Sequence, residues 1–184
     1  MAIEPERIVL TYQDYMALPE DGKRYELFEG EIDMAPATNV PHQTIVGNLF
    51  LILSVHIRAH GLGKIFVAPC DVVLSDTTVL QPDLLFVSRE RELIVTRENV
   101  QGAPDLVVEV TSPASALRDR GIKQQLYAKY GVAHYWLVNP ARRELVALSL
   151  EAGSYHQTAA AKGEEVFSAP PFSDLPIPLT ETWE

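Results

Sequence analysis

The chain has 184 residues, with 15 Lys or Arg against 25 Asp or Glu, a formal net charge of −10 and 47% hydrophobic residues. A chain of this size and composition forms roughly one globular domain, and it buries enough surface to fold without a disulfide framework or a structural metal. The negative charge argues against a broad electrostatic hold on nucleic acid. Any such role needs a local basic patch, a bound cation, or an oligomer that pools several patches.

The single cysteine and the apolar segments bear on the cellular compartment. Cys70 cannot form an intrachain disulfide, which suits a reducing cytoplasm. The amino terminus carries acidic residues and lacks the basic flank and apolar stretch of a signal peptide. The longest apolar run, residues 49–53, is far short of the roughly 20 residues that cross a bilayer. We therefore expect a cytoplasmic protein that is not embedded in a membrane.

The first half of the chain predicts a hairpin, one long helix and two strands. Residues 24–34, RYELFEGEIDM, alternate apolar and polar side chains around a Glu-Gly pair, which is typical of a hairpin. Apolar residues then recur at helical spacing over 41–60, which predicts a helix. Two glycines just after residue 60 end the pattern. Segments 64–74 and 79–87 are rich in Val, Ile and Phe, and the polar stretch between them favours a turn between two strands.

The second half predicts a buried strand, a second helix and three further strands. DLVVEV, residues 105–110, is nearly all apolar, as expected of a central strand covered on both faces. An amphipathic pattern over 119–130, ended by Gly131, predicts the second helix. The other strand candidates are 134–138, 144–150 and 155–160, and a Pro-rich arm follows over about 168–184. We expect a single α/β domain over residues 1–184 with a mixed sheet.

Two carboxylates interrupt apolar strand sequences, Asp83 in QPDLLFV and Glu109 in DLVVEV. An ionised carboxylate in a sheet core must be paired, hydrogen-bonded or bound to a metal, otherwise it neutralises. If the two strands are neighbours, a hard divalent cation between the acids, Mg²⁺ or Mn²⁺, relieves their repulsion. The alternative is that each acid pairs with a basic side chain or lies at a strand end in water.

Other candidate residues have ordinary structural interpretations. Lys123 lies four residues after Asp119 on the second predicted helix, a spacing typical of a surface ion pair. In the functional alternative, Lys123 points at the two carboxylates and its charge orients an attacking water. His42 is interpreted as a capping or packing residue that could instead be a ligand, and Cys70 as an inert thiol. Nucleophile-elbow, phosphate-loop and zinc-ligand spacings do not occur in the sequence, which argues against serine hydrolysis, nucleotide binding and zinc binding.

The order of four motifs is more specific than any one of them. YELFEGEI is followed by QPDLLFV, then APDLVVEVTSP, then DRGIKQQLYAKYGVAHYWLVNP. This order, from about Tyr25 to Pro140, resembles the Uma family of restriction-endonuclease-like proteins, which carry the PD-(D/E)XK nuclease fold. The resemblance implies an α+β restriction-endonuclease-like core, with a mixed and largely antiparallel sheet flanked by two main helices.

The resemblance also implies roles for individual residues. Asp83 matches the acid of the PD half-motif and Glu109 the acid of the second half, so both would bind Mg²⁺ or Mn²⁺. The standard lysine lies two residues after that second acid, where this chain has Thr111. The family is thought to supply the charge from the following helix, at Lys123, with Gln124 as a weaker substitute. Glu31 matches a recurrent acidic position of the family and would be a third acid near the metal.

These residues lead to the hypothesis of Mg²⁺-dependent hydrolysis of DNA phosphodiester bonds by a homodimer. Basic residues near the second helix would contact phosphates; they are Arg118, Arg120, Lys129, Arg142 and Arg143. A second hypothesis is a nuclease-derived domain without turnover that binds nucleic acid or a protein. A third is a hydrolase of small phosphoesters. A Lys123 turned toward both acids favours catalysis, a Lys123 turned to solvent favours the binding domain, and a closed pocket favours the small substrate.

Overall fold

The computed structural model describes residues 8–35, 37–112, 115 and 119–184. The first helices and strands are α1 (Tyr12–Met16), β1 (Tyr25–Phe28), β2 (Glu31–Met34) and α2 (Val40–His60). Next come β3 (Gly63–Val67), β4 (Val72–Ser75), β5 (Thr78–Leu80), β6 (Leu84–Ser88), the 3₁₀ helix η1 (Arg89–Ile94), β7 (Val100–Gln101) and β8 (Leu106–Val110). The last are the π-helical turn η2 (Asp119–Lys123), α4 (Gln124–Tyr130), β9 (His134–Asn139), the 3₁₀ turn η3 (Pro140–Arg142), β10 (Glu144–Glu151), β11 (Ser154–Lys162), β12 (Val166–Ala169), β13 (Phe172–Pro178) and α5 (Thr180–Trp183).

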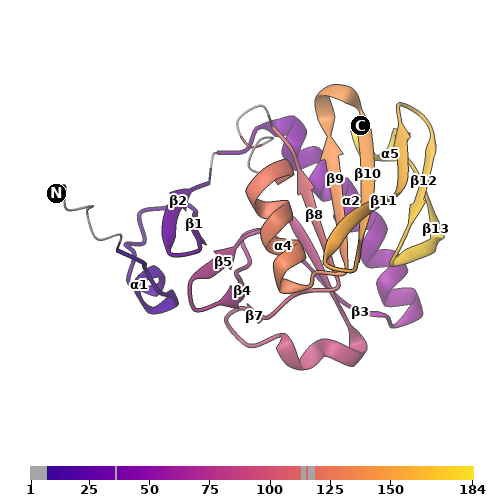
Figure 1. Cartoon of the computed structure of the whole chain (residues 1–184). Helices are drawn as coiled ribbons and strands as arrows, with labels where there is room; N and C mark the ends of the chain where they lie inside the picture. Colours follow the sequence, from indigo (N-terminus) through magenta and orange to yellow (C-terminus); the bar gives the residue numbers. More distant parts are fainter. Residues whose placement is uncertain (1–7, 36, 113–114, 116–118) are drawn as a thin grey trace.

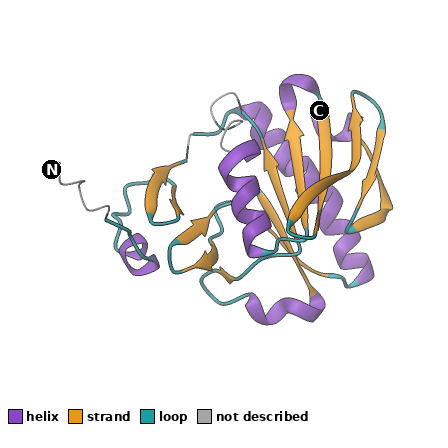
Figure 2. Ribbon diagram, viewed as in Figure 1, coloured by secondary structure: helices purple, strands orange, loops and turns teal. Residues whose placement is uncertain are grey.

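The strands form one main sheet and two smaller ones (Figure 2). The main sheet has the order β11-β10-β9-β8-β6-β3, in which only the β8–β9 pair is parallel. The second sheet has the order β2-β1-β5-β4-β7, and β12 pairs with β13. The predicted fold class, a mixed and largely antiparallel sheet in an α+β protein, is confirmed.

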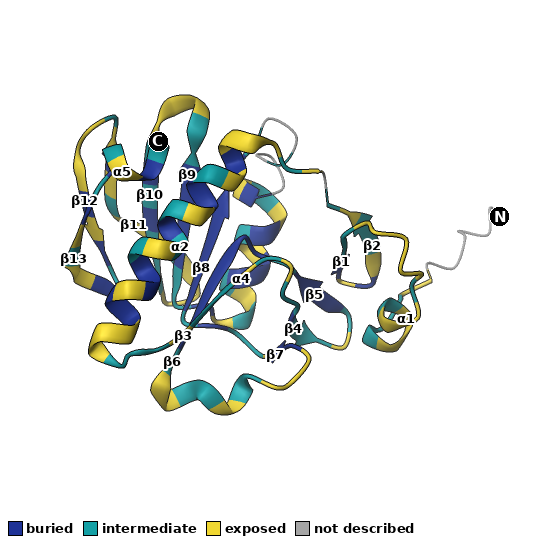
Figure 3. Ribbon diagram, turned by 180° about the vertical axis from the view of Figure 1, so that it is seen from behind, coloured by how far each residue is buried: buried dark blue, intermediate teal, exposed yellow. Residues whose placement is uncertain are grey.

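The two main helices cover opposite faces of the main sheet (Figures 1 and 3). Leu49 and Leu53 of α2 pack with Val108 and Trp136 in one core cluster. Leu126 and Tyr127 of α4 lie in a second cluster on the other face. All five residues of β8 are buried, as expected of a strand covered on both faces.

The long helix α2 has clear signals at both ends. The side chain of Asn39 accepts a hydrogen bond from the backbone N–H of His42, and Gly61 ends the helix in the left-handed conformation, with φ of 60°. By length and composition alone α2 could cross a membrane. Here it is the core helix of the main sheet, with Leu49, Leu53 and Ile57 buried.

Prolines divide the two strands predicted over 64–74 and 79–87. The first segment becomes β3 and β4, separated around Pro69, and the second becomes β5 and β6, separated around Pro82. Proline has no backbone N–H to donate to a strand partner, so each ladder stops there. After each break the chain passes to the other sheet, because β3 and β6 belong to the main sheet and β4 and β5 to the second.

The Pro-rich segment over about 168–184 differs from the extended arm that its composition favours. It contains part of β12, all of β13 and the helix α5, and it packs against α2. Phe172, Ile177 and Leu179 are buried in the same core cluster as α2. Apolar side chains between the prolines anchor this segment, because their burial outweighs the lost backbone hydrogen bonds.

Candidate active site

Asp83 and Glu109 lie beside each other on neighbouring strands of the main sheet. Strands β6 and β8 are antiparallel, and Leu84 is paired with Val108. Continuing this register by one residue places Asp83 opposite Glu109, at the distance of cross-strand neighbours. Both acids are buried, and neither makes an ion pair with an arginine among the described residues.

Asp83 is held by two contacts to the same carboxylate oxygen. Its Oδ2 accepts a hydrogen bond of 2.8 Å from the backbone N–H of Val110 and lies 3.2 Å from Nε2 of His42. Because an ionised carboxylate only accepts hydrogen bonds, this contact requires the proton on Nε2 of the histidine. His42, whose role the sequence left open, therefore lies in the site.

Glu109 is held by side chains from η2 and α4. Its Oε1 accepts hydrogen bonds from Nζ of Lys123 and from the hydroxyl of Tyr127, both of 3.0 Å. Lys123 is only 5% exposed, so its ammonium group points at the acids and not at solvent. Of the two alternatives for Lys123, burial excludes a side chain turned to solvent; its nitrogen contacts Glu109, and no contact with Asp83 occurs among those of the described residues.

A second buried acid, Glu26, reaches the same lysine from the other sheet. Its Oε1 lies 2.9 Å from Nζ of Lys123 and also accepts a hydrogen bond of 2.8 Å from the backbone N–H of Gln81. Glu26 belongs to β1 and is 1% exposed. The ammonium group of Lys123 therefore joins the two sheets at the site.

The π-helical turn η2 brings Asp119 and Lys123 inward together. The spacing of these residues predicted a surface pair, yet both are buried. A π turn is rare in proteins and often occurs at functional sites. Here it precedes the regular helix α4 and places the charged ends of Asp119 and Lys123 against the same cavity.

The site carries more negative than positive charge. Burial raises the pKa of Glu109 well above its usual value, with Lys123 opposing the shift and Asp83 adding to it. The pKa of Asp119 is also raised, again mainly by burial. Burial alone would lower the pKa of Lys123, but the neighbouring carboxylates Glu109 and Glu26 outweigh it and raise that pKa.

One carboxylate oxygen of Asp83 and one of Glu109 are not used by the contacts described above. The contacts of Asp83 use Oδ2 and those of Glu109 use Oε1. The second oxygens have no hydrogen-bond partner among the described residues. Within the same residues, no group of three or more His, Cys, Asp or Glu side chains is arranged to hold a metal ion.

A cavity opens beside these side chains at the junction of the two sheets. Its lining combines acids, hydroxyls, an arginine and the start of α2. The lining residues are Arg24, Glu26, Ala35, Ala37, Thr38, Asn39, His42, Gln81, Asp83, Glu109, Val110, Ser112, Ser115, Asp119 and Lys123.

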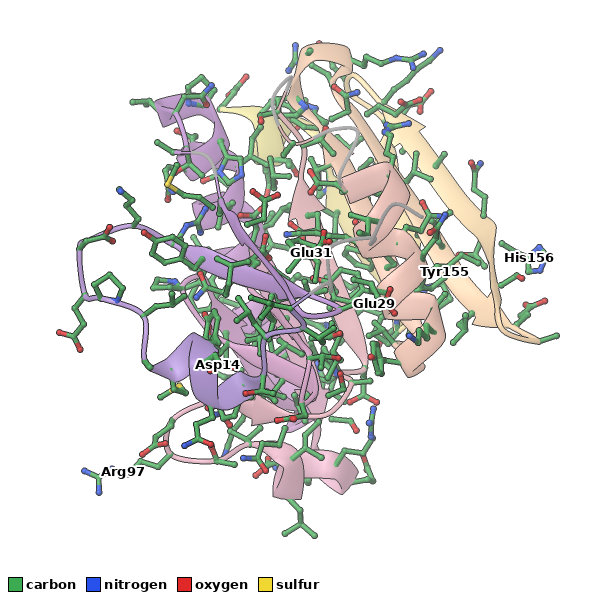
Figure 4. All side chains as sticks on the ribbon, turned by 60° about the vertical axis from the view of Figure 1, so that its left-hand side comes forward. Asp14, Glu29, Glu31, Arg97, Tyr155 and His156 are labelled. Carbon is green, nitrogen blue, oxygen red and sulfur yellow. The ribbon has the colours of Figure 1, made fainter. Side chains whose placement is uncertain are left out.

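Glu31 and Gln124 do not line this cavity. Uninterrupted alternation along the chain would place Glu29 and Glu31 on one face of the hairpin and Glu26 on the other. The register instead pairs Phe28 with Glu31, so Glu31 shares a face with Glu26, because the two-residue turn interrupts the alternation. Glu31 is exposed near the turn, and Glu29 pairs with Lys129 (Figure 4).

The other predicted residues that the structure describes do not line this cavity. Arg120 is exposed and lines a separate depression with Gln124 and Arg142. Arg118 falls outside the described residues. Thr111, at the position of the standard lysine, is buried, and its hydroxyl donates to the carbonyl of Val138. Its side chain is thus engaged within the sheet.

Sequence reasoning missed Glu26 as a site residue. The available signal was its place in YELF, where it lies between apolar residues as Asp83 and Glu109 do. A charged residue in such a strand needs a partner when buried. Glu29 and Glu31 lie in the same motif, and spacing along the chain does not distinguish them from Glu26.

Comparisons with known proteins agree with this fold. The sequence matches the Uma2 family, described as "Putative restriction endonuclease", over residues 12–180. It has no match among the curated proteins. The fold is similar to that of a protein from Anabaena variabilis ATCC 29413, described as "a putative nuclease belonging to DUF820", with a TM-score of 0.76. The two are 16% identical, and the match covers 95% of this chain and 97% of the other. Because the family match spans most of the chain, this protein belongs to the Uma2 family of restriction-endonuclease-like proteins.

Proposed function

We propose that this chain hydrolyses phosphodiester bonds of DNA with the help of Mg²⁺ or Mn²⁺. The observation that carries the proposal is the pair of neighbouring acids, Asp83 and Glu109, beside a buried lysine at the edge of a cavity. Restriction-endonuclease-like families generally use divalent metals. The substrate, the metal and the roles of the residues are proposals for this chain.

The residues present fit a hard divalent ion. Asp83 and Glu109 each have one oxygen that no described residue engages. Mg²⁺ is commonly bound by one or two carboxylates, with water and substrate phosphate as the remaining ligands. A pair of acids without a third protein side chain is consistent with such a site. Burial is the main cause of the raised pKa of Glu109, and the neighbouring Asp83 adds to it, so a bound cation would favour the ionised form of this acid.

Each chemical requirement of the reaction has a candidate group. A bound divalent ion supplies positive charge that polarises a phosphate oxygen and makes water more acidic. Asp83 and Glu109 would hold that ion. Lys123 would orient the attacking water and stabilise the charge that develops on the phosphoryl group.

The surrounding side chains keep these groups in place. Glu26 holds the ammonium group of Lys123, and the Tyr127 hydroxyl holds Glu109. His42 fixes the carboxylate of Asp83 from the opposite side. Positioning of this kind contributes strongly to catalysis, because misplacement by about 1 Å can cost a hundredfold in rate.

The rival function is a nuclease-fold domain that binds nucleic acid or protein without turnover. Thr111 in place of the standard lysine and the net charge of −10 are the observations in its favour. The burial of Lys123 between Glu26 and Glu109 at the edge of a cavity favours the enzyme, since clusters of buried ionisable groups in a cleft are frequent at active sites.

The test is cleavage of plasmid and single-stranded DNA with Mg²⁺ or Mn²⁺, using the wild type, Asp83→Ala and Lys123→Ala. Glu31→Ala is the matched control, because it removes an exposed acid outside the cavity. We expect metal-dependent cleavage by the wild type and the control, and none by the other two. Equal activity in all four proteins would indicate a contaminating enzyme and refute the proposal.

The same assay separates the remaining alternatives. Hydrolysis of a small phosphodiester without cleavage of DNA would favour the third hypothesis. Binding of DNA without cleavage, combined with metal binding measured by calorimetry, would favour the binding domain. The homodimer stays a prediction, which sedimentation would check.

A further inference from the structure

The positively charged side chains that line the active-site cavity differ in how far they are engaged. Lys123 is enclosed between two carboxylates at 2.9 and 3.0 Å. His42 directs Nε2 at Asp83. Arg24 also lines the cavity, but its guanidinium group has no ion-pair or hydrogen-bond partner among the described residues. Arg24 is therefore the basic side chain of this lining that can contact a ligand.

The backbone fixes where Arg24 lies. Its carbonyl accepts a hydrogen bond of 2.9 Å from the N–H of Ala35, which extends the β1–β2 ladder by one residue. Arg24 and Glu26 are two residues apart in this extended segment, so their side chains leave the same side of the chain. Glu26 is buried at the bottom of the site, whereas Arg24 is half-buried. Arg24 therefore lies nearer to solvent than the acids do.

An anionic substrate faces an electrostatic problem at this cavity. Glu26, Asp83, Glu109 and Asp119 line it, and the charge of Lys123 is shared between two of them. A phosphodiester that approaches four acids needs a cation beyond the metal to offset their repulsion. Arginine suits this role, because its planar fork donates two parallel hydrogen bonds to a phosphate and its charge does not titrate.

We propose that Arg24 binds the substrate phosphate in this site. Its guanidinium group would donate two hydrogen bonds to the nonbridging oxygens of the scissile or an adjacent phosphate. The inference rests on the proposed phosphodiesterase function and names a substrate contact that the sequence motifs did not include. Arg24 touches substrate, whereas Lys123 faces the acids. The two cations thus have separate tasks, despite lining one cavity.

The experiment measures binding separately from cleavage. Wild type, Arg24→Ala, Arg24→Lys and Arg97→Ala are titrated into a fluorescently labelled oligodeoxynucleotide in Ca²⁺, which also takes carboxylate ligands. Arg97→Ala is the matched control, because it removes the same charge from an exposed residue that extends away from the molecule (Figure 4). Thermal unfolding confirms that each variant is folded.

We expect Arg24→Ala to raise the dissociation constant about tenfold or more, as for loss of a charge-assisted contact. Arg24→Lys keeps the charge but not the fork, and it should fall between the wild type and Arg24→Ala. Arg97→Ala should stay within about twofold of the wild type, since exposed charges remote from a site contribute little. If Arg24→Ala fails to fold, a threefold or greater loss in Arg24→Lys supports the proposal by itself.

Two results would overturn the inference: an Arg24→Ala protein that binds like Arg97→Ala, or a wild type that does not bind the oligonucleotide at all. Cleavage assays on the same proteins keep this outcome distinct from failure of the proposed function. Arg24-dependent binding without cleavage would refute the function and leave the phosphate contact standing. Cleavage by the wild type and equally by Arg24→Ala would refute the contact alone.

Discussion

Nζ of Lys123 lies 2.9 Å from Oε1 of Glu26, a residue that belongs to a different sheet. The same nitrogen lies 3.0 Å from Oε1 of Glu109 in the main sheet. Both carboxylates are buried, so the lysine is their principal source of positive charge. The stability of the fold and the geometry of the site consequently depend on one side chain.

Replacing Lys123 with methionine should destabilise the protein strongly. The change keeps most of the side-chain volume but leaves Glu26 and Glu109 buried without their shared cation, at a cost of about 3–5 kcal/mol in the free energy of unfolding. Urea unfolding of the two proteins measures the difference. Lys64→Met is the control, because Lys64 is exposed and its ion pair among the described residues is with Glu92. A loss for Lys123→Met no larger than that of the control would contradict the expected dependence.

Replacing Glu26 with glutamine should reduce cleavage while preserving the fold. The amide keeps the shape of the side chain but weakens its hold on Lys123, which then has Glu109 as its remaining ionic partner. We expect kcat to fall about tenfold, as for a modest loss of positioning, with KM little changed. Glu31→Gln should retain full activity. The reverse result would restore Glu31 as the third acid of the site.

The raised pKa of Glu109 predicts how stability depends on pH. Its pKa is raised mainly by burial, above the usual 4.5, so in the window just above that value the folded protein binds a proton that the unfolded chain has released. Stability from this group therefore decreases as the pH rises toward the folded pKa. Asp119 acts in the same direction.

Urea unfolding between about pH 5 and pH 8, without divalent metal, measures this dependence. The wild type should lose stability across the range, and Glu109→Gln should lose less because position 109 no longer titrates. A steeper loss in Glu109→Gln than in the wild type would contradict the prediction. Divalent metal binds the ionised carboxylates, so adding Mg²⁺ should stabilise the wild type most at the alkaline end.

Truncating Phe172 to alanine should show that the C-terminal segment belongs to the core. Phe172 is 1% exposed and meets Phe86 edge-to-face, with ring centroids 4.9 Å apart. Loss of a buried phenylalanine typically costs about 3–5 kcal/mol. A change below about 1 kcal/mol in urea unfolding would indicate that this segment is a loosely attached arm after all. Leu175→Ala, at a partly buried position, should cost less.

The sequence predicted the fold well wherever a regular pattern was long. The apolar spacing of α2 and the continuous apolar run of β8 identify both elements because each buries a large face. The breaks at Pro69 and Pro82 were not foreseen, since the apolar composition continues across them. The C-terminal hairpin was missed for a different reason, because the prolines beside Leu175 and Ile177 conceal their alternation.

The site was predictable in part for similar reasons. Asp83 and Glu109 stand out as acids within apolar strands, and the cross-strand register brings them together. The spacing of Lys123 alone favours a surface pair with Asp119, and only the resemblance to a known family pointed inward. The contact between Glu26 and Lys123 depends on how two sheets meet, which periodicity along one chain does not encode.

The ion pair between Glu26 and Lys123 joins two segments that are synthesised at different times. Glu26 leaves the ribosome long before Lys123, so the nascent chain carries an acid whose cationic partner in the described structure has yet to be synthesised. Until then, solvent is the favourable environment for that carboxylate. We therefore expect the candidate site to become complete only after residue 123 has been synthesised.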